Sequence, residues 1–404
     1  MTSASSSRIC DVLVVGGGPV GLFAAVLLAQ AGLDVVVWER RTSPSTHSRA
    51  IGIHPPSLHA FAAAGLVDDV LDAAVHIGAG DARSRGRTLG TVSFASADAQ
   101  YPFVASLGQS ATTGIIRAAL LANGGVAVDH GVELTGLRFE PDHVHATGRS
   151  LGGSAEGDPS GGDVDVEVSV SARFLVGADG ARSTVRSILG IRAGEHEYRD
   201  RYVMGDFADQ TGEGDLAVVH LEPAGVVESF PLPDGVRRFV AWTGSAGRPD
   251  STAPTAADLA ALVTARTGVP VDPASNSMLS AFGVRRRIAD RMTLGRVVIL
   301  GDAAHEISPI GGQGMNLGWA DAVAIAPLIA RGVRAGRPPR EALEHVSRIR
   351  LDAAARAATQ AEANMALGRP VGEVGLVVRD ALLRATLHSP AARVLANAYT
   401  MRWL

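Results

Sequence analysis

The hydrophobic and polar positions at the start of the chain predict a strand, a helix and a second strand. Residues 11–15 form a short apolar run that predicts a buried strand, and residues 22–31 predict an apolar helix that ends at Gly32. Residues 35–38 predict a second buried strand. A strand, a glycine-rich turn, a helix and a strand in this order are typical of a nucleotide-binding unit.

Between residues 54 and 170 the hydrophobic pattern predicts both helices and strands. Residues 54–74 have a helical pattern, and residues 109–122 have the periodicity of an amphipathic helix. Residues 126–128, 132–139 and 164–170 alternate between apolar and polar residues, which predicts an antiparallel meander.

A second layer is predicted further along the chain. Short alternating runs in residues 198–240 predict an antiparallel sheet, residues 297–300 return to a buried strand, and the pattern after Asn316 is helical. A chain of 404 residues has room for two or three structural units. We therefore predict a discontinuous nucleotide-binding domain (residues 8–75, 105–190 and 285–330), a β-sheet substrate domain (76–104 and 191–284) and C-terminal helices (331–404).

The net charge and the cysteine content exclude several classes of partner and site. The net charge is -4 and no long basic run is present, so we expect no nucleic-acid partner. Cys10 is the single cysteine, which excludes an internal disulfide, a CxxC redox pair and a thiolate zinc site. The sequence contains neither an HExxH helix nor a GxSxG nucleophile elbow, and we predict no metal site.

The ends of the chain bear on its location. Residues 1–8 are rich in serine and lack the features of a signal peptide, so we expect a cytoplasmic protein. No apolar stretch is long enough to span a bilayer. Residues 374–404 alternate Leu, Val and Ala with Arg, which favours helices packed on the body or on a partner subunit over membrane contact.

The first glycine cluster predicts a phosphate-binding turn. In Gly16-Gly17-Gly18-Pro19-Val20-Gly21, the glycines allow a tight turn, close approach of the backbone to a pyrophosphate, and packing of the helix on the strand. Glu39 follows about 20 residues later and can accept hydrogen bonds from ribose hydroxyls. Its charge favours FAD or NAD over NADP, although Arg40 and Arg41 weaken this argument. An ordinary glycine-rich turn is the alternative.

A second cluster, Gly301-Asp302-Ala303-Ala304-His305, favours flavin over nicotinamide. Asp302 directly follows a predicted strand, where its carboxylate can accept hydrogen bonds from polyol hydroxyls. Residues 309–314 bring backbone N–H groups to the start of a helix near Met315, and the partial positive charge there suits an anionic or electron-accepting ring edge. The alternative is a capped loop with a packed His305.

Together with Gly177-Ala178-Asp179-Gly180, Ser183 and Arg186, these motifs resemble class A FAD-dependent aromatic hydroxylases, such as para-hydroxybenzoate hydroxylase and the ubiquinone-pathway hydroxylases. The resemblance covers about residues 10–327. It implies an α/β fold in which a Rossmann-like FAD-binding domain of the GR2 type carries an inserted antiparallel β-sheet substrate domain and a helical C-terminus.

The resemblance also assigns site residues. Glu39 would hold the adenosine ribose, Val132 the adenine, Arg49 and Gln109 the pyrophosphate side, and Asp302 the ribitol or pyrophosphate region. Pro309 and residues 311–316 would line the isoalloxazine, and Asp179 would support both FAD and transient NAD(P)H binding. The expected cofactor-binding residues are Gly16, Gly18, Pro19, Val20, Gly21, Glu39, Arg40, Arg49, Gln109, Val132, Asp179, Asp302, Pro309, Gly311, Gly312, Gly314, Met315 and Asn316.

The implied reaction is monooxygenation. NADH or NADPH reduces FAD, O2 adds to the flavin as a hydroperoxide, and its terminal oxygen is transferred to a phenolic, polyketide or quinone-precursor ring. The residue that activates the substrate is not identified, and His220 and Tyr202 are candidates. The alternatives are an FAD-dependent reductase or dehydrogenase of a prenyl or other apolar substrate, and a non-catalytic flavin-binding protein. We expect a monomer or a homodimer.

Overall fold

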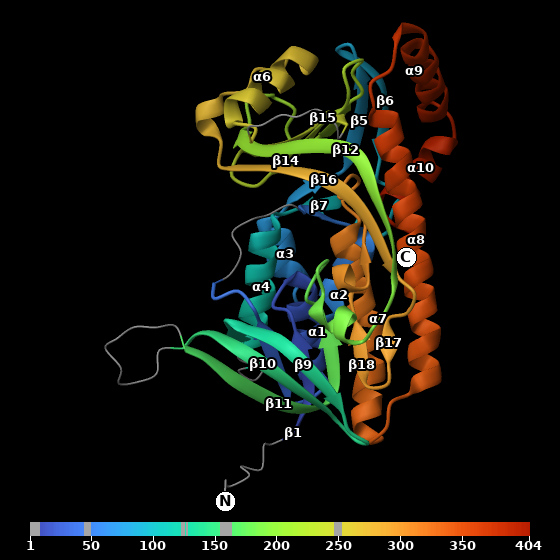
Figure 1. The fold of residues 1–404 in the computed structure, drawn as a ribbon. Helices are drawn as coiled ribbons and strands as arrows, with labels where there is room; N and C mark the ends of the chain where they lie inside the picture. The colour runs from blue at the N-terminus through green and yellow to red at the C-terminus, as the bar shows by residue number, and fades with distance from the viewer. Residues whose placement is uncertain (1–8, 44–49, 123–125, 127, 154–163, 246–252) are drawn as a thin grey trace, which may run out of the picture.

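The computed structural model describes residues 9–43, 50–122, 126, 128–153, 164–245 and 253–404. Figure 1 shows two large sheets, one above the other, with the long helix α8 (Arg340–Gly368) running beside both of them. The fold class predicted from the sequence, an α/β Rossmann-like domain with a second β-sheet layer and a helical C-terminus, is confirmed.

The first sheet is largely parallel. It contains, in spatial order, β17 (Thr293–Leu294), β18 (Val297–Ile299), β11 (Val164–Gly177), β1 (Ile9–Val15), β2 (Val35–Glu39) and β8 (Val128–His130). From β18 to β8 neighbouring strands are parallel. The antiparallel strands β9 (Val132–Phe139) and β10 (Val144–Gly153) extend the sheet from β11.

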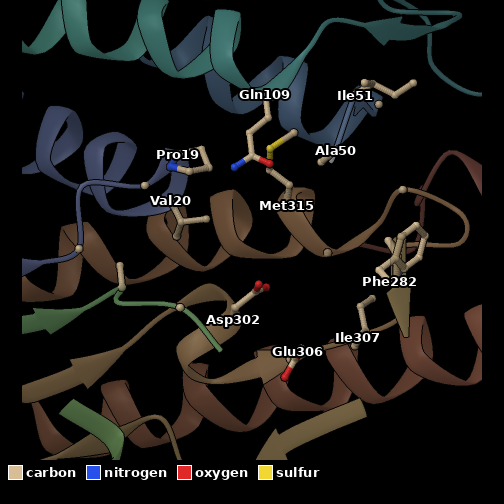
Figure 2. A pocket seen from close by; sticks show the side chains of 18 of the residues that line it. Pro19, Val20, Ala50, Ile51, Gln109, Phe282, Asp302, Glu306, Ile307 and Met315 are labelled. Atoms are coloured by element: carbon tan, nitrogen blue, oxygen red, sulfur yellow. The ribbon is translucent and has the colours of Figure 1, made fainter. Parts of the chain in front are cut away.

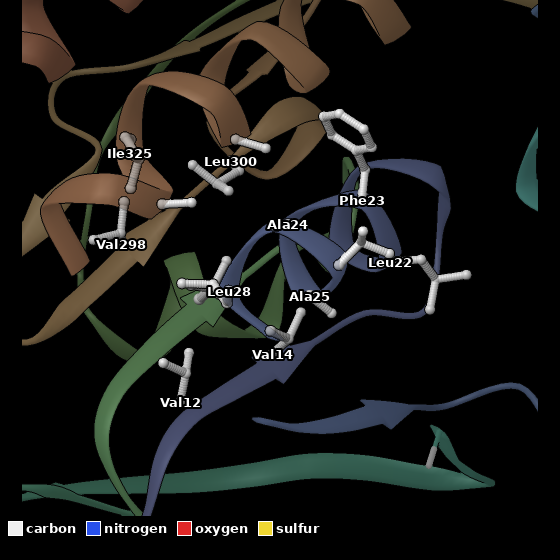
Figure 3. Packing of buried hydrophobic residues seen from close by; sticks show 14 of the residues in the cluster. Val12, Val14, Leu22, Phe23, Ala24, Ala25, Leu28, Val298, Leu300 and Ile325 are labelled. Atoms are coloured by element: carbon white, nitrogen blue, oxygen red, sulfur yellow. The ribbon is translucent and has the colours of Figure 1, made fainter. Parts of the chain in front are cut away.

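The core of this layer lies between the sheet and three helices. Helix α1 (Pro19–Gln30) contacts both α4 (Gln109–Ala122) and α7 (Gly314–Arg334). Because α1 is apolar all round, it is buried rather than amphipathic. Figure 3 shows Leu22, Ala25 and Leu28 of α1 packing above Val12 and Val14 of β1.

The antiparallel meander predicted from the sequence is partly wrong. β9 and β11 are antiparallel to a strand that was not predicted, β10, which lies between them, and β8 pairs in parallel with β2 at the edge of the first sheet. A strand of three residues carries too little pattern to specify its partner, so the neighbouring strand decides the pairing.

The second sheet is mainly antiparallel. It contains, in spatial order, β19 (His305–Glu306), β16 (Met278–Ala289), β12 (Ala193–Ala208), β15 (Val236–Ser245), β14 (Val227–Leu232), β13 (Ala217–His220), β5 (Ala79–Ser84) and β6 (Arg87–Ser93). Helix α6 (Ala256–Thr267) covers one face with Leu259 and Val263, which pack against Phe207 and Phe239. The opposite face of this sheet is not covered by α6.

The remaining elements connect the layers. They are a small sheet of β3 (Gly52–Ile53), β7 (Val104–Ser106) and β4 (Val75–Ile77), the helices α2 (Pro55–Ala63), α3 (Val67–Ala73), α5 (Thr184–Ile188), α9 (Glu373–Leu387) and α10 (Ala391–Tyr399), and the 3-10 helices Pro273–Ser275 and Gly301–Ala303.

The helical pattern predicted after Asn316 is confirmed. Among the described helices, none is long and apolar enough to cross a membrane. The predicted domain boundaries near residues 104 and 284 fall inside β7 and β16, and the division into domains stays a prediction.

Candidate active site

A single large cavity of about 780 Å³ runs from the first glycine turn to the open face of the second sheet. Its walls include Gly16 and Glu39 at one end and Met204 and Phe282 at the other. This volume lies within the range of about 300–1,000 Å³ that is usual for ligand pockets. Figure 2 shows side chains of α1, α4, α7 and the second sheet around this space.

The glycine turn at the start of α1 has the geometry that close packing requires. Gly16 has a φ of +115°, and a Cβ there would lie 2.3 Å from the carbonyl oxygen of Ala178. A Cβ on Gly21 would lie 2.0 Å from the carbonyl oxygen of Gly16, so only glycine lets α1 approach the turn. Gly18 differs, because a Cβ there would meet no protein atom within 4 Å.

The N-terminus of α1 opens into the cavity. Gly18 is the N-cap, Pro19 begins the helix, and no acidic side chain lies in the first turn. Gly16, Gly18, Pro19 and Val20 line the cavity, whereas Gly21 lies behind them in the helix packing. The unpaired N–H groups and the positive end of the helix dipole therefore form a site for an anion.

Glu39 ends β2 at the cavity wall. Its Oε2 accepts a hydrogen bond from the Gly17 amide at 2.6 Å, and its Oε1 accepts one from the Arg41 amide at 2.8 Å. Each carboxylate oxygen can accept a further bond, so ribose hydroxyls still find acceptors here. Arg40 and Val132 line the same end of the cavity.

Asp179 and Arg186 hold the middle motif in place. The carboxylate of Asp179 accepts hydrogen bonds from Ser183 Oγ at 2.6 Å and from the Val185 amide at 3.0 Å, which fixes the start of α5. The guanidinium of Arg186 donates to the carbonyl oxygen of Ala303 at 2.8 Å. This bond ties the middle motif to the Asp302 loop. Asp179 also lines the cavity.

Asp302 follows the end of β18 and is open to the cavity. Figure 2 shows its carboxylate pointing into the space opposite Pro19, Gln109 and Met315. None of the described residues donates a hydrogen bond to this carboxylate. Enclosure by the cavity walls raises the pKa of Asp302 to about 6. An acidic group kept without a partner in this position is suited to accept hydrogen bonds from ligand hydroxyls.

The turn before α7 forms the next part of the wall. Pro309, Gly311, Gly312, Gly314 and Met315 line the cavity. Gly311 and Gly312 have φ values of +98° and +68°, a conformation that favours glycine. The turn therefore presents backbone rather than side chains to a ligand.

Asn316 has a different role from the one expected. Its Oδ1 accepts a hydrogen bond from the His54 amide at 2.9 Å, and its Nδ2 donates to the carbonyl oxygens of Gly52 and Gly312 at 2.9 Å each. The side chain is buried and is not among the cavity-lining residues. Its amide thus joins β3 to the turn, and any contribution to a ligand site is through positioning.

The two catalytic candidates are buried behind the cavity wall. Tyr202 is buried, stacks on Phe282 with ring centroids 5.7 Å apart, and does not line the cavity. His220 is buried in β13, where burial lowers its pKa to about 4, and it does not line the cavity either. A catalytic role for either residue stays a prediction. Arg49 lies outside the described residues.

Sequence reasoning missed several residues that line the chamber on the second sheet. They include Met204, Glu228, Val240, Phe282 and Tyr399. Glu228 is the one charged residue of the strand β14, whose other residues are apolar except for Ser229, and this could have identified it. Tyr399 comes from the C-terminal helix α10, and nothing in its local sequence indicates a place in the cavity.

The described residues fit a bound FAD. An anion site at the start of α1, free acceptor positions on Glu39 and the unpaired carboxylate of Asp302 match a pyrophosphate, a ribose and a polyol chain in that order. That these residues bind FAD stays a prediction.

Comparisons with known proteins point the same way. The 6-methylpretetramide 4-monooxygenase of Streptomyces rimosus is 33% identical to this chain over 391 residues, which cover 93% of this chain and 66% of that protein. A rifampicin monooxygenase of Streptomyces venezuelae is 32% identical over 324 residues, which cover 77% of this chain and 62% of that protein. The chain thus spans about two thirds of the length of these curated relatives.

A solved structure and a family match complete the comparison. The crystal structure of p-nitrophenol 4-monooxygenase from Pseudomonas putida matches with a TM-score of 0.85 at 24% identity, covering 97% of this chain and 98% of that chain, which supports the fold alone. Residues 9–361 match the family described as FAD binding domain. The resemblance to FAD-dependent aromatic hydroxylases is confirmed, and the chain belongs to the FAD-binding domain family.

Proposed function

We propose that this protein is an FAD-dependent, NAD(P)H-consuming monooxygenase that hydroxylates an aromatic ring. The observation that carries the proposal is the continuity of the cavity, which joins the turn at Gly18 and Glu39, where we propose that the dinucleotide binds, to a chamber at Met204 and Phe282. A ring held in that chamber would lie beside the Pro309–Met315 turn, where the resemblance puts the flavin. FAD, when bound, supplies the oxygen-activating chemistry.

The chain's own residues would bind the cofactor and exclude water. The first turn of α1 would hold the pyrophosphate, and Asp302 would accept hydrogen bonds from the polyol. Phe282, Val240 and Met204 give the chamber an apolar wall, which lowers the water content around a reactive oxygen species.

The relatives support a large aromatic substrate. Their names refer to rifampicin and to 6-methylpretetramide, and by analogy we propose a phenolic or polyketide-type ring for this chain. O2 and either NADH or NADPH would be the co-substrates. A cytoplasmic location and a monomeric or homodimeric state complete the proposal.

The test is turnover of the FAD-loaded protein with isotopically labelled O2. NADH or NADPH oxidation and oxygen uptake are measured with a panel of phenols and polycyclic phenols, and the products are analysed by mass spectrometry. Label in the product, in proportion to NAD(P)H consumed, supports the proposal. Reduction of an apolar substrate without incorporation of label would favour the reductase alternative, and a purified protein that binds no FAD would overturn the proposal altogether.

A further inference from the structure

Glu228 is an acidic residue in an apolar part of the chamber. It lies in β14, where its Cα partners are Val240 of β15 and Val219 of β13. Phe230, two residues further along the strand, lines the cavity on the same face of the sheet. The carboxylate of Glu228 therefore points into the chamber beside Val240 and Phe230, and Arg238 of β15 lines the cavity on the same face of the sheet.

Within the described part of the chain, no ion pair compensates the charge of Glu228. Among the described residues, the Glu228 carboxylate has no hydrogen-bond or salt-bridge partner, and burial raises its pKa to about 7. Asp206 on the same sheet shows the contrast, because Arg238 binds its carboxylate through two hydrogen bonds of 2.6 and 2.7 Å. A carboxylate left unpaired while a neighbouring one is fully paired is suited to meet a ligand.

Tyr399 faces the same chamber from α10. Its ring stacks on Phe94 with centroids 5.7 Å apart and meets the edge of His54 at 6.0 Å. Its hydroxyl has no hydrogen-bond partner among the described residues. Tyr399 packs on the same apolar cluster as Phe230, which lies two residues from Glu228 on β14. Two polar groups without partners thus share one apolar space.

The chemistry of this pair selects its ligand. An ionised carboxylate only accepts hydrogen bonds, whereas a tyrosine hydroxyl both donates and accepts. A ligand carboxylate or phosphate near Glu228 would be repelled, but a neutral aromatic hydroxyl could donate to Glu228 and accept from Tyr399. We infer that Glu228 and Tyr399 bind a hydroxyl group of an uncharged hydroxyaromatic substrate, with Glu228 as the acceptor of the hydroxyl proton. The inference rests on the proposed function.

In this role Glu228 accepts a proton from the hydroxyl group of the substrate. The O–H bond of the substrate breaks, its proton forms a new O–H bond on the Glu228 carboxylate, and the electron pair stays on the substrate oxygen. The ring becomes more electron-rich, which aids attack on an electrophilic oxygen. The proton returns to the product or to solvent afterwards, so Glu228 is unchanged over a cycle.

The test is binding of matched probes to FAD-loaded protein by calorimetry. The probes are 2-naphthol, its methyl ether 2-methoxynaphthalene, and the anionic 6-hydroxy-2-naphthoate. We expect wild-type protein to bind 2-naphthol about tenfold more tightly than the ether near pH 8, because a hydrogen bond to a charged acceptor is among the stronger ones. That advantage should shrink near pH 6, and the anionic probe should bind more weakly than 2-naphthol.

Two variants isolate the pair. Glu228→Gln should lower the affinity for 2-naphthol about tenfold near pH 8 and abolish its pH dependence, while the ether binds as before. Tyr399→Phe should lower the affinity for 2-naphthol severalfold and keep the pH dependence. A merely structural role would affect both probes and FAD retention alike. Glu167→Gln, at an exposed position of β11, is the matched control and should change neither probe.

Two results would overturn the inference. One is wild-type protein that shows no preference for 2-naphthol over its ether, including the case in which neither binds. The other is Glu228→Gln protein that retains the wild-type affinity and pH profile. The outcome is separate from that of the proposed function, because binding that depends on Glu228 can occur without hydroxylation, and hydroxylation can occur without dependence on Glu228.

Discussion

His305 Nε2 and Asp321 Oδ2 lie 2.7 Å apart in the interior, with both side chains fully buried. Asp321 Oδ2 also accepts a hydrogen bond from the Gly301 amide at 3.1 Å, and Asp321 Oδ1 accepts one from Arg350 Nε at 2.8 Å. Burial works against the charge on His305, but the charge of Asp321 and its hydrogen bond outweigh it and raise the pKa of His305. This network, which joins α7 and α8 to the Asp302 loop, fixes the loop from behind.

Replacing Asp321 should therefore destabilise the protein strongly. Asp321→Asn leaves the buried guanidinium of Arg350 without its counter-charge, and breaking a buried pair in this way costs about 3 kcal/mol or more. Urea unfolding at neutral pH measures the loss. Asp290→Asn is the control. Of the described residues, only the exposed Arg192 and Arg291 form ion pairs with Asp290, so this change should cost less than about 1 kcal/mol. Equal losses in the two variants would contradict the role given to the network.

Two glycines of the first turn should separate folding from cofactor binding. Gly21→Ala forces a methyl group to within 2.0 Å of the Gly16 carbonyl oxygen, so α1 must shift, and we expect a loss of about 3 kcal/mol in unfolding free energy. Gly18→Ala meets no protein atom and has a φ of -78°, so stability should change by less than about 1 kcal/mol.

Gly18→Ala should weaken FAD binding even though it leaves the stability of the protein nearly unchanged. The methyl group of Gly18→Ala would occupy open space at the helix N-terminus, and we expect the FAD affinity to fall about tenfold or more in a protein of normal stability. Fluorescence quenching of FAD on binding gives the affinity. If Gly18→Ala binds FAD with the wild-type affinity, the pyrophosphate does not bind at this turn.

Asp302 should control FAD retention in a pH-dependent way. Asp302→Ala removes an ionised acceptor of polyol hydroxyls and should weaken FAD binding about tenfold or more. In the wild-type protein the pKa of Asp302 is about 6, so FAD affinity should fall as the pH falls through this value, and the variant should lack this dependence. FAD titrations between about pH 5 and 8 check both points. Unchanged affinity in Asp302→Ala would refute the polyol assignment.

Local sequence was sufficient for the parts of the site that lie at strand ends. The turn from Gly16 to Gly21 and the position of Asp302 follow from a buried strand, a glycine and a helix that are adjacent in the chain. The extent of α4 was also predictable, because its amphipathic pattern is long and bounded.

Contacts between distant segments were not predictable in the same way. Asn316 was expected to line a ring, but its amide is taken up by backbone groups of β3 and of the turn, and no local pattern shows which backbone groups need a partner. Tyr202 and His220 were chosen for their chemistry in the right sheet, yet Glu228 and Tyr399 line the cavity. The meeting of β14 with α10 depends on the tertiary fold.

Glu228 also predicts how stability should vary with pH. Its pKa in the folded protein is about 7, above the ordinary value of 4.5, so the folded state binds more protons than the unfolded state between these values. The free energy of unfolding should therefore fall as the pH rises through this window, and Glu228→Gln should remove that part of the fall.

We expect Glu228→Gln to gain about 2 kcal/mol relative to wild type on going from about pH 5 to about pH 8, a figure reduced from the full pKa shift because the carboxylate is partly open to the cavity. Urea unfolding of both FAD-loaded proteins at the two pH values gives this difference, in which the titration of all other groups cancels. Glu167→Gln should show no such change. A constant difference between Glu228→Gln and wild type across the pH range would mean that the Glu228 carboxylate is already compensated in the folded protein, and its availability to a substrate hydroxyl would then lose its physical basis.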